Sequence, residues 1–174
     1  MPVQLKPDSE IADSITCILS DVDGVMTDGR IVYDNQGVET KRFHVRDGVG
    51  IKAWMNSGFG FGILTARTSK IVSQRAGELG IEHVQQGYED KWPAAQSMLS
   101  VMGYQPEQVC YIGDDLPDIA VMRRVALAVA PADAAFDAQE AADWILRSQG
   151  GEGALRELIE RLLRSKQRWE EHLG

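Results

Sequence analysis

The sequence lacks several features, and each absence excludes a class of protein. With 18 lysines and arginines against 26 acidic residues, it has no basic surplus for binding nucleic acid. Its two cysteines, Cys17 and Cys110, lie in apolar runs, which predicts buried reduced thiols rather than disulfides. No apolar run approaches the roughly 18–20 residues of a membrane span, and residues 1–10 contain no secretory signal. We therefore expect a cytoplasmic protein that binds neither membrane nor nucleic acid.

What is present is an ordinary globular composition, with 44% hydrophobic and 25% charged residues in 174 positions. A chain of this length buries about 70% of its unfolded surface, so it needs no metal or disulfide to stabilise a core. We expect a single domain over 1–174, with its core at about 15–164 and loosely held ends at 1–10 and 165–174.

Short apolar runs alternate with segments of helical periodicity. Strands are predicted at 15–20, 59–64, 83–85, 109–112, 127–130 and 144–146, and helices at 48–57, 69–79, 92–102 and 153–164. This alternation predicts an α/β fold, a Rossmann-like three-layer sandwich with a central parallel sheet. The segments 31–33 and 38–45 flank the turn-rich tetrapeptide 34–37 and predict a protruding β-hairpin.

The residues that follow the predicted strands are polar. They are Asp21, Asp23 and Gly24 after the first strand, Thr65 after the second, Lys91 near the third, and Asp114, Asp115 and Asp118 after the fourth. Because open α/β sheets bind ligands at the carboxyl ends of their strands, we expect these residues to share one edge. Since side chains alternate along a strand, Asp21 and Asp23 can address one substrate.

Crowded carboxylates repel one another unless a proton or a cation relieves them. Oxygen ligands without histidine or cysteine favour a hard cation, above all Mg²⁺, which commonly pairs with a substrate phosphate. Lys91 and Thr65 supply a positive charge and a donor for phosphate oxygens, and Gly24 lets backbone N–H groups approach an anion. The pattern thus predicts phosphoryl transfer.

These four groups, in this order, resemble the haloacid dehalogenase superfamily of aspartate-nucleophile phosphatases. The resemblance implies that Asp21 forms an aspartyl phosphate, and that Asp23 protonates the leaving oxygen and then activates water. It also implies that Thr65 and Lys91 hold the phosphoryl group.

The same resemblance implies a metal site and its surroundings. Asp21, Asp114 and the backbone carbonyl of Asp23 would ligate Mg²⁺, while Asp115 and Asp118 would belong to an outer acidic layer. The intervals between the four groups leave no room for a separate cap domain, and an uncapped site needs closing by something else. A neighbouring subunit that contacts the hairpin would do this.

The segments 21–29, 43–51 and 150–157 resemble one capless branch, the 3-deoxy-D-manno-octulosonate 8-phosphate phosphatases, over about residues 15–164. This implies a homotetramer that hydrolyses a sugar-acid phosphate in lipopolysaccharide synthesis, with hairpins at the subunit contacts and C-terminal segments near a neighbour's site. One departure is Ala66, where the branch usually has glycine; alanine disfavours positive φ.

A sugar acid carries a carboxylate besides its phosphate, which favours arginine in the pocket. The candidate substrate-binding residues are Gly24, Arg46, Gly48, Arg67 and Arg75, with Arg67 and Arg75 expected on one helix face. Two alternatives remain open. One is a phosphatase for a nine-carbon keto-deoxy sugar acid 9-phosphate, and the other is a catalytically idle homo-oligomerisation module. The intact acidic set argues against the second.

Overall fold

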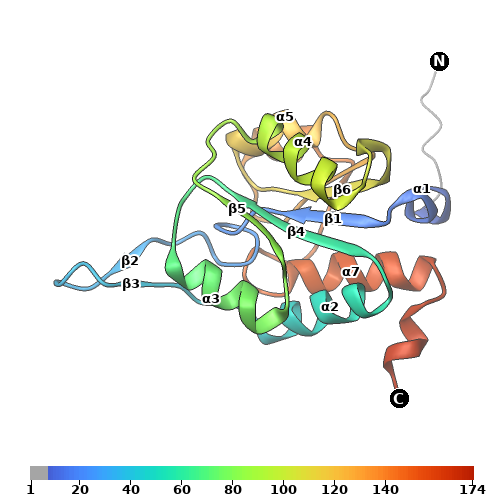
Figure 1. Ribbon diagram of the computed structural model, residues 1–174, viewed down its shortest axis with the longest axis horizontal. Coiled ribbons are helices and arrows are strands. Elements are labelled where there is room, and N and C mark those ends of the chain that lie inside the picture. Colours follow the sequence, from blue (N-terminus) through green and yellow to red (C-terminus); the bar gives the residue numbers. More distant parts are fainter. Residues whose placement is uncertain (1–7) are drawn as a thin grey trace.

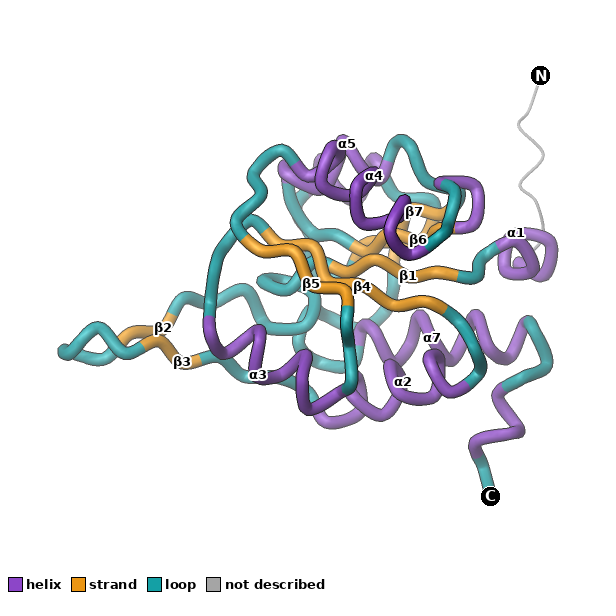
Figure 2. Tube along the Cα trace, in the orientation of Figure 1, coloured by secondary structure: helices purple, strands orange, loops and turns teal. Residues whose placement is uncertain are grey.

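The computed structural model describes residues 8–174, which are built around a six-stranded parallel sheet (Figures 1 and 2). Its strands lie in the order β5-β4-β1-β6-β7-β8, and every neighbouring pair is parallel. Their bounds are β1 (Cys17–Ser20), β4 (Gly60–Thr65), β5 (His83–Gln86), β6 (Val109–Ile112), β7 (Leu127–Ala130) and β8 (Trp144–Ile145). The predicted α/β fold with a central parallel sheet is confirmed.

Helices cover both faces of this sheet (Figure 1). One face packs against α2 (Val45–Asn56), α3 (Lys70–Leu79) and α7 (Ala154–Ser165), with α1 (Asp8–Ser14) beside α7, and the other against α4 (Lys91–Met102), α5 (Ile119–Met122) and α6 (Phe136–Ala141). Successive residues of β1 point to opposite faces, so Ile18 joins the first core and Leu19 the second. This double burial explains why the inner strands β6 and β7 are apolar throughout, whereas the half-buried edge strand β5 contains polar residues.

The predicted hairpin is present, but its second arm is shorter than expected. Strands β2 (Val32–Tyr33) and β3 (Glu39–Thr40) pair antiparallel and extend away from the sheet (Figure 1). The prediction of an extended arm through residue 45 is wrong, because Val45 begins α2. His44 caps that helix, its side chain accepting a hydrogen bond from the Arg46 N–H at 3.2 Å.

The C-terminal end also differs from expectation. A 3₁₀ helix at Trp169–His172 follows α7, and it buries the Trp169 ring in the core, 5% exposed. The Arg156 guanidinium stacks on that ring, with Cζ 4.8 Å from the centroid. At the other end, residues 8–10 belong to α1, and the rest of the segment predicted to be loose lies outside the described residues. Within residues 8–174, no helix combines the length and hydrophobicity needed to cross a membrane.

The packing of the C-terminal end gives a testable prediction. Replacing Trp169 by alanine leaves a cavity beside α7, so the free energy of unfolding should fall by about 3 kcal/mol in urea titrations. Leu173, 62% exposed and four residues further on, provides the control, since Leu173→Ala should cost less than about 0.5 kcal/mol. Equal small losses for both variants would show that the end is loose after all.

Candidate functional site

The carboxyl edge of the sheet is organised around β1, which lies between β4 and β6. Asp21 directly follows β1, and Thr65 is the last residue of β4. Asp114 is the second residue after the end of β6. The chain turns to one side of β1 to form β4 and β5 and later returns to the other side to form β6. This reversal is the topological switch point where open α/β sheets bind ligands.

Lys91, the first residue of α4, is buried between the carboxylates of Asp21 and Asp118. Its Nζ lies 2.9 Å from Asp21 Oδ1 and 2.6 Å from Asp118 Oδ1, and the lysine side chain is 1% exposed. Burial alone would lower the pKa of Lys91, but the two carboxylates outweigh it and raise that pKa. The lysine therefore stays an ammonium ion at the floor of the site.

Asp118 is fully buried, and protein donors already occupy both of its carboxylate oxygens. Oδ1 accepts from the Tyr111 hydroxyl at 2.5 Å as well as from Lys91, and Oδ2 accepts from the N–H groups of Asp114 and Asp115 at 2.9 and 3.1 Å. Asp118 thus has little capacity left for a further ligand and orients the lysine and the Asp114 loop instead. Asp115 is exposed, and its Oδ1 accepts from the Leu116 N–H at 2.8 Å.

Asp114 and Asp21 carry the strongest electrostatic perturbation in the cavity. Burial, together with repulsion from Asp21 and Asp118, raises the pKa of Asp114 to about 8. Burial and the Asp118 charge raise the pKa of Asp21 to about 6 against the opposing effect of Lys91. Three carboxylates and one ammonium leave a surplus of negative charge, so the site needs a proton or a cation for full stability.

Gly24 permits Asp114 to approach the loop after β1. Gly24 has φ +88°, and a Cβ built on it would lie 1.9 Å from Asp114 Oδ2, closer than atoms can come. Any side chain at this position would displace the carboxylate as well as strain the backbone.

Asp23 lies in the turn beyond β1, so its orientation does not follow from strand alternation as the sequence suggested. The hairpin supplies its partner, because the Lys41 ammonium forms an ion pair with Asp23 Oδ1, with the lysine side chain 1% exposed. Lys41 Nζ also lies 3.3 Å from Glu39 Oε1. Arg67 Nη1 lies 3.1 Å from the same Glu39 oxygen and 4.0 Å from Asp23 Oδ2. The hairpin is thereby tied to the loops after β1 and β4.

A cavity of about 290 Å³ lies at the sheet edge. The cavity is lined by Asp21, Asp23, Gly29, Ile31, Thr65, Ala66, Arg67, Lys91, Asp114, Asp115, Pro117 and Asp118. All of the residues predicted to have catalytic or metal-binding roles are therefore in one place. Within residues 8–174, Gln167 is the residue other than glycine with positive φ, so Ala66 fits its loop without left-handed strain.

Not all predicted substrate-binding residues reach this cavity. Arg67 lines it, but in a loop, so the expectation that Arg67 and Arg75 share a helix face is wrong. Arg75, within α3, pairs with Glu78 at 3.1 Å and lies over the Phe43 ring. Gly48 packs against the Arg75 guanidinium.

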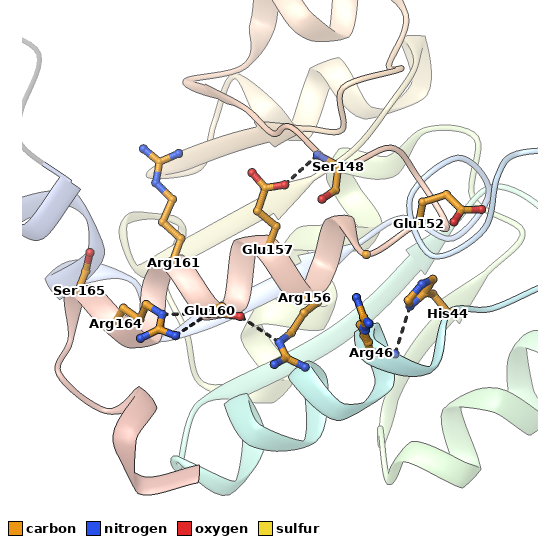
Figure 3. A pocket seen from close by; sticks show the side chains of 11 residues that line it. His44, Arg46, Ser148, Glu152, Arg156, Glu157, Glu160, Arg161, Arg164 and Ser165 are labelled. Atoms are coloured by element: carbon orange, nitrogen blue, oxygen red, sulfur yellow. Dashed lines mark hydrogen bonds and ion pairs between the residues drawn. The ribbon is translucent and has the colours of Figure 1, made fainter. Parts of the chain in front are cut away.

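Arg46 lines a different, larger pocket of about 610 Å³ between the start of α2 and α7 (Figure 3). Two of its arginines already have a carboxylate partner, since Glu160 pairs with Arg156 at 3.2 Å and with Arg164 at 2.7 Å. The smaller cavity, with its unbalanced carboxylates, is the stronger candidate for chemistry.

Three residues that contact site residues were not predicted from the sequence: Lys41, Glu39 and Tyr111. Glu39 and Lys41 are two positions apart on one hairpin arm, which would have placed them on a common face. Tyr111 lies in an apolar strand, where its hydroxyl is the single polar group and requires a buried partner.

Comparisons with known proteins match this geometry. A model of the haloacid dehalogenase-like hydrolase family matches residues 81–158. The 3-deoxy-D-manno-octulosonate 8-phosphate phosphatase of Yersinia pestis is 44% identical over 163 residues, covering 94% of this chain and 87% of the relative. The corresponding Escherichia coli K12 enzyme is 42% identical with the same coverage.

Solved structures agree. The Yersinia pestis phosphatase superposes with a TM-score of 0.91, covering 93% of this chain and 88% of its own. A Moraxella catarrhalis phosphatase of the same name, solved with a magnesium ion, a phosphate ion and a KDO molecule, has 36% identity, a TM-score of 0.92 and coverage of 95% of both chains. From this similarity along almost the whole sequence, the chain belongs to the 3-deoxy-D-manno-octulosonate 8-phosphate phosphatase family of haloacid dehalogenase-like hydrolases.

Proposed function

We propose that this chain hydrolyses 3-deoxy-D-manno-octulosonate 8-phosphate to the free sugar acid and phosphate. The observation that carries the proposal is the buried Asp21–Lys91–Asp118 arrangement beside Asp114 at the floor of the cavity. Family membership supports the substrate, since the named relatives act on this compound. The cytoplasmic location and the single-domain organisation expected from the sequence stay predictions.

The residues fit a divalent cation, and we propose Mg²⁺. Oxygen atoms of Asp21, Asp114 and Asp118 lie within 4.8 Å of one another, with no nitrogen or sulfur ligand among them. Because protein donors occupy Asp118, we assign the metal to Asp21, Asp114 and the Asp23 carbonyl. When bound, the cation would neutralise charge on the phosphoryl oxygens and on Asp21. A magnesium ion in the Moraxella catarrhalis relative supports this assignment.

The proposed reaction has two steps. Asp21 attacks phosphorus and the bond to the sugar oxygen breaks. Asp23, which must exchange its ion pair with Lys41 for a proton before this step, transfers that proton to the sugar oxygen. Asp23, now a carboxylate, takes a proton from water as the water attacks the aspartyl phosphate, which releases phosphate and regenerates Asp21. Lys91 and the Thr65 hydroxyl bind the phosphoryl oxygens throughout, and their burial at the cavity floor strengthens these contacts.

Arg67 is the proposed reader of the sugar-acid carboxylate. It lines the cavity beside Thr65, and its guanidinium is held toward the hairpin by Glu39 and by the Tyr33 hydroxyl at 2.9 Å. A guanidinium presents a planar fork that matches a carboxylate, so this position suits an acidic sugar. The other predicted substrate-binding residues, Gly24, Arg46, Gly48 and Arg75, do not line the cavity, and their role in substrate binding stays a prediction.

We also propose a homotetramer formed through the hairpin. Ile31, Val32, Tyr33 and Val38 are between 47% and 57% exposed there, an apolar surface that association would bury. Because Ile31 also lines the cavity, a neighbour at the hairpin would help to close the site. Light scattering should report four chains per particle.

Asp21→Asn tests the nucleophile. The amide cannot form the phosphoenzyme, so turnover of 3-deoxy-D-manno-octulosonate 8-phosphate with Mg²⁺ should fall by about 10⁴-fold or more in a phosphate-release assay. Asp137→Asn, an exposed change in α6, is the control and should keep full activity. Full activity of Asp21→Asn would overturn the mechanism.

The wild-type enzyme tests the substrate. Inactivity on this substrate with activity on the nine-carbon 9-phosphate would change the substrate, and inactivity on both would favour the idle module.

Arg67→Ala tests substrate reading. Loss of a charge-assisted hydrogen bond should lower kcat/KM for the sugar-acid phosphate by about 10–100-fold. Turnover of a small phosphate ester without a carboxylate should change far less. Arg123→Ala, an exposed change on the α5 side, is the matched control. An equal loss on both substrates would mean that Arg67 does not recognise the carboxylate.

Asp114→Asn tests whether charge repulsion among the carboxylates destabilises the site without a metal. The measurement is the Tm of thermal unfolding with a chelator present. The pKa of Asp114 is raised from 3.8 to about 8, so the native state holds more protons than the unfolded chain between these values and stability falls as pH rises. Removing the charge should therefore raise the Tm at pH 8 by about 2–4 °C, equivalent to about 1 kcal/mol. At pH 4 the variant should differ little, and a gain independent of pH would contradict this account.

A further inference from the structure

The segment 147–153, which leads into α7 and is called here the α7 approach loop, lies directly behind the turn that carries Asp23 and Gly24. The Gly151 N–H donates to the Val25 carbonyl at 2.9 Å, and the Ser148 carbonyl accepts from the Ala132 N–H at 3.0 Å. This loop therefore bonds both to the turn after β1 and to the segment after β7. No residue of the loop lines the carboxylate cavity.

Two carboxylates accept hydrogen bonds from the α7 approach loop, and a third holds the start of α7. Glu157 in α7 accepts from the N–H groups of Arg147 and Ser148 at 3.0 and 2.8 Å. Asp133, after β7, accepts from the Gly150 N–H at 2.8 Å. Asp47 in α2 is 3% exposed and accepts from the Arg156 N–H at 2.8 Å, which fixes the start of α7. A loop with this many charge-assisted bonds is rigid for a segment without regular structure.

Two of the three glycines in this loop, Gly150 and Gly151, touch the backbone of the neighbouring turn. A Cβ built on Gly150 would lie 1.9 Å from the Gly24 carbonyl oxygen. One built on Gly151 would lie 2.5 Å from the Asp28 nitrogen. Because these atoms belong to main chain and not to flexible side chains, the neighbour cannot yield without moving the turn itself.

Gly24 is confined on its other side by the acidic cluster. Its own hypothetical Cβ would lie 1.9 Å from Asp114 Oδ2. Gly24 thus lies between Gly150, which approaches the Gly24 carbonyl, and the Asp114 carboxylate, both at a closeness that only glycine allows. A shift of the α7 approach loop would be transmitted through Gly24 to the carboxylate.

We propose that the α7 approach loop is a positioning element for the metal site, and that Gly150 is its critical residue. It fixes the position of Gly24, and through Gly24 the separation between the neighbouring Asp23 carbonyl and Asp114, both assigned above to Mg²⁺. The inference rests on the proposed function for the identity of the ion. According to this inference, residues that do not touch the reacting atoms determine how tightly the site binds that ion.

Titration calorimetry with MgCl₂ alone tests the proposal without relying on turnover. Gly150→Ala should raise the Kd for Mg²⁺ by about tenfold, the lower range for loss of a supporting contact around a metal. Gly153→Ala is the control from the same loop, since a Cβ built on Gly153 meets no atom within 4 Å, whereas its φ of +99°, unlike the φ of Gly150, lies in the left-handed region. The control should strain the backbone without displacing the neighbouring turn, and it should leave the Kd within twofold.

A general loss of stability must be separated from a loss of positioning. Leu162→Ala, in the buried face of α7, should lower the Tm without changing the Kd for Mg²⁺. If Gly150→Ala fails to fold, Asp133→Ala removes the exposed acceptor of the Gly150 N–H and should raise the Kd about threefold, a smaller loss than direct displacement.

The outcomes are distinct. Wild-type protein that binds no Mg²⁺ would refute the proposed function and this inference together. Wild-type binding with an unchanged Kd for Gly150→Ala, or for Asp133→Ala where the first variant does not fold, would refute the positioning role alone. Equal increases for Gly150→Ala and Leu162→Ala would also refute it, because they would trace the effect to stability.

Discussion

The ion pair between the Lys91 ammonium and the carboxylates of Asp21 and Asp118 is the interaction on which the site depends. A buried ammonium is costly unless it is paired, and here two carboxylates pair with it at 2.9 and 2.6 Å. The lysine in turn lets those carboxylates remain charged close to Asp114. Lys91 thus allows the site to be both buried and charged, and phosphoryl transfer benefits from both properties.

Around this ion pair, the fold brings together segments that are far apart in the sequence. The parallel sheet aligns the ends of β1, β4 and β6, and the hairpin returns Lys41 and Glu39 to Asp23 and Arg67. On the opposite side, the α7 approach loop supports Gly24 through backbone contact. The acidic residues supply chemistry, whereas glycines and ion pairs at the periphery govern their separation.

Sequence patterns were most informative where one local signal sufficed. Strands β6 and β7 appear with the predicted bounds, because four consecutive apolar residues between turns fit a strand buried on both faces. The short helices α1, α5 and α6 were missed, since elements of seven, four and six residues carry too little periodicity to detect. The hairpin's second arm was extended too far, because histidine is not a typical helix cap and His44 therefore gave no sign of the helix that begins at Val45.

By itself, the sequence determined the fold class and the set of groups at the sheet edge, since residues that directly follow buried strands must emerge at one end of a parallel sheet. Tertiary structure alone decided which arginine faces the cavity, how Lys41 engages Asp23, and why Gly24 and Gly150 admit no side chain. Those outcomes depend on contacts between segments up to about 130 positions apart. Neither periodicity nor spacing records such contacts, because they arise only when the helices and loops pack.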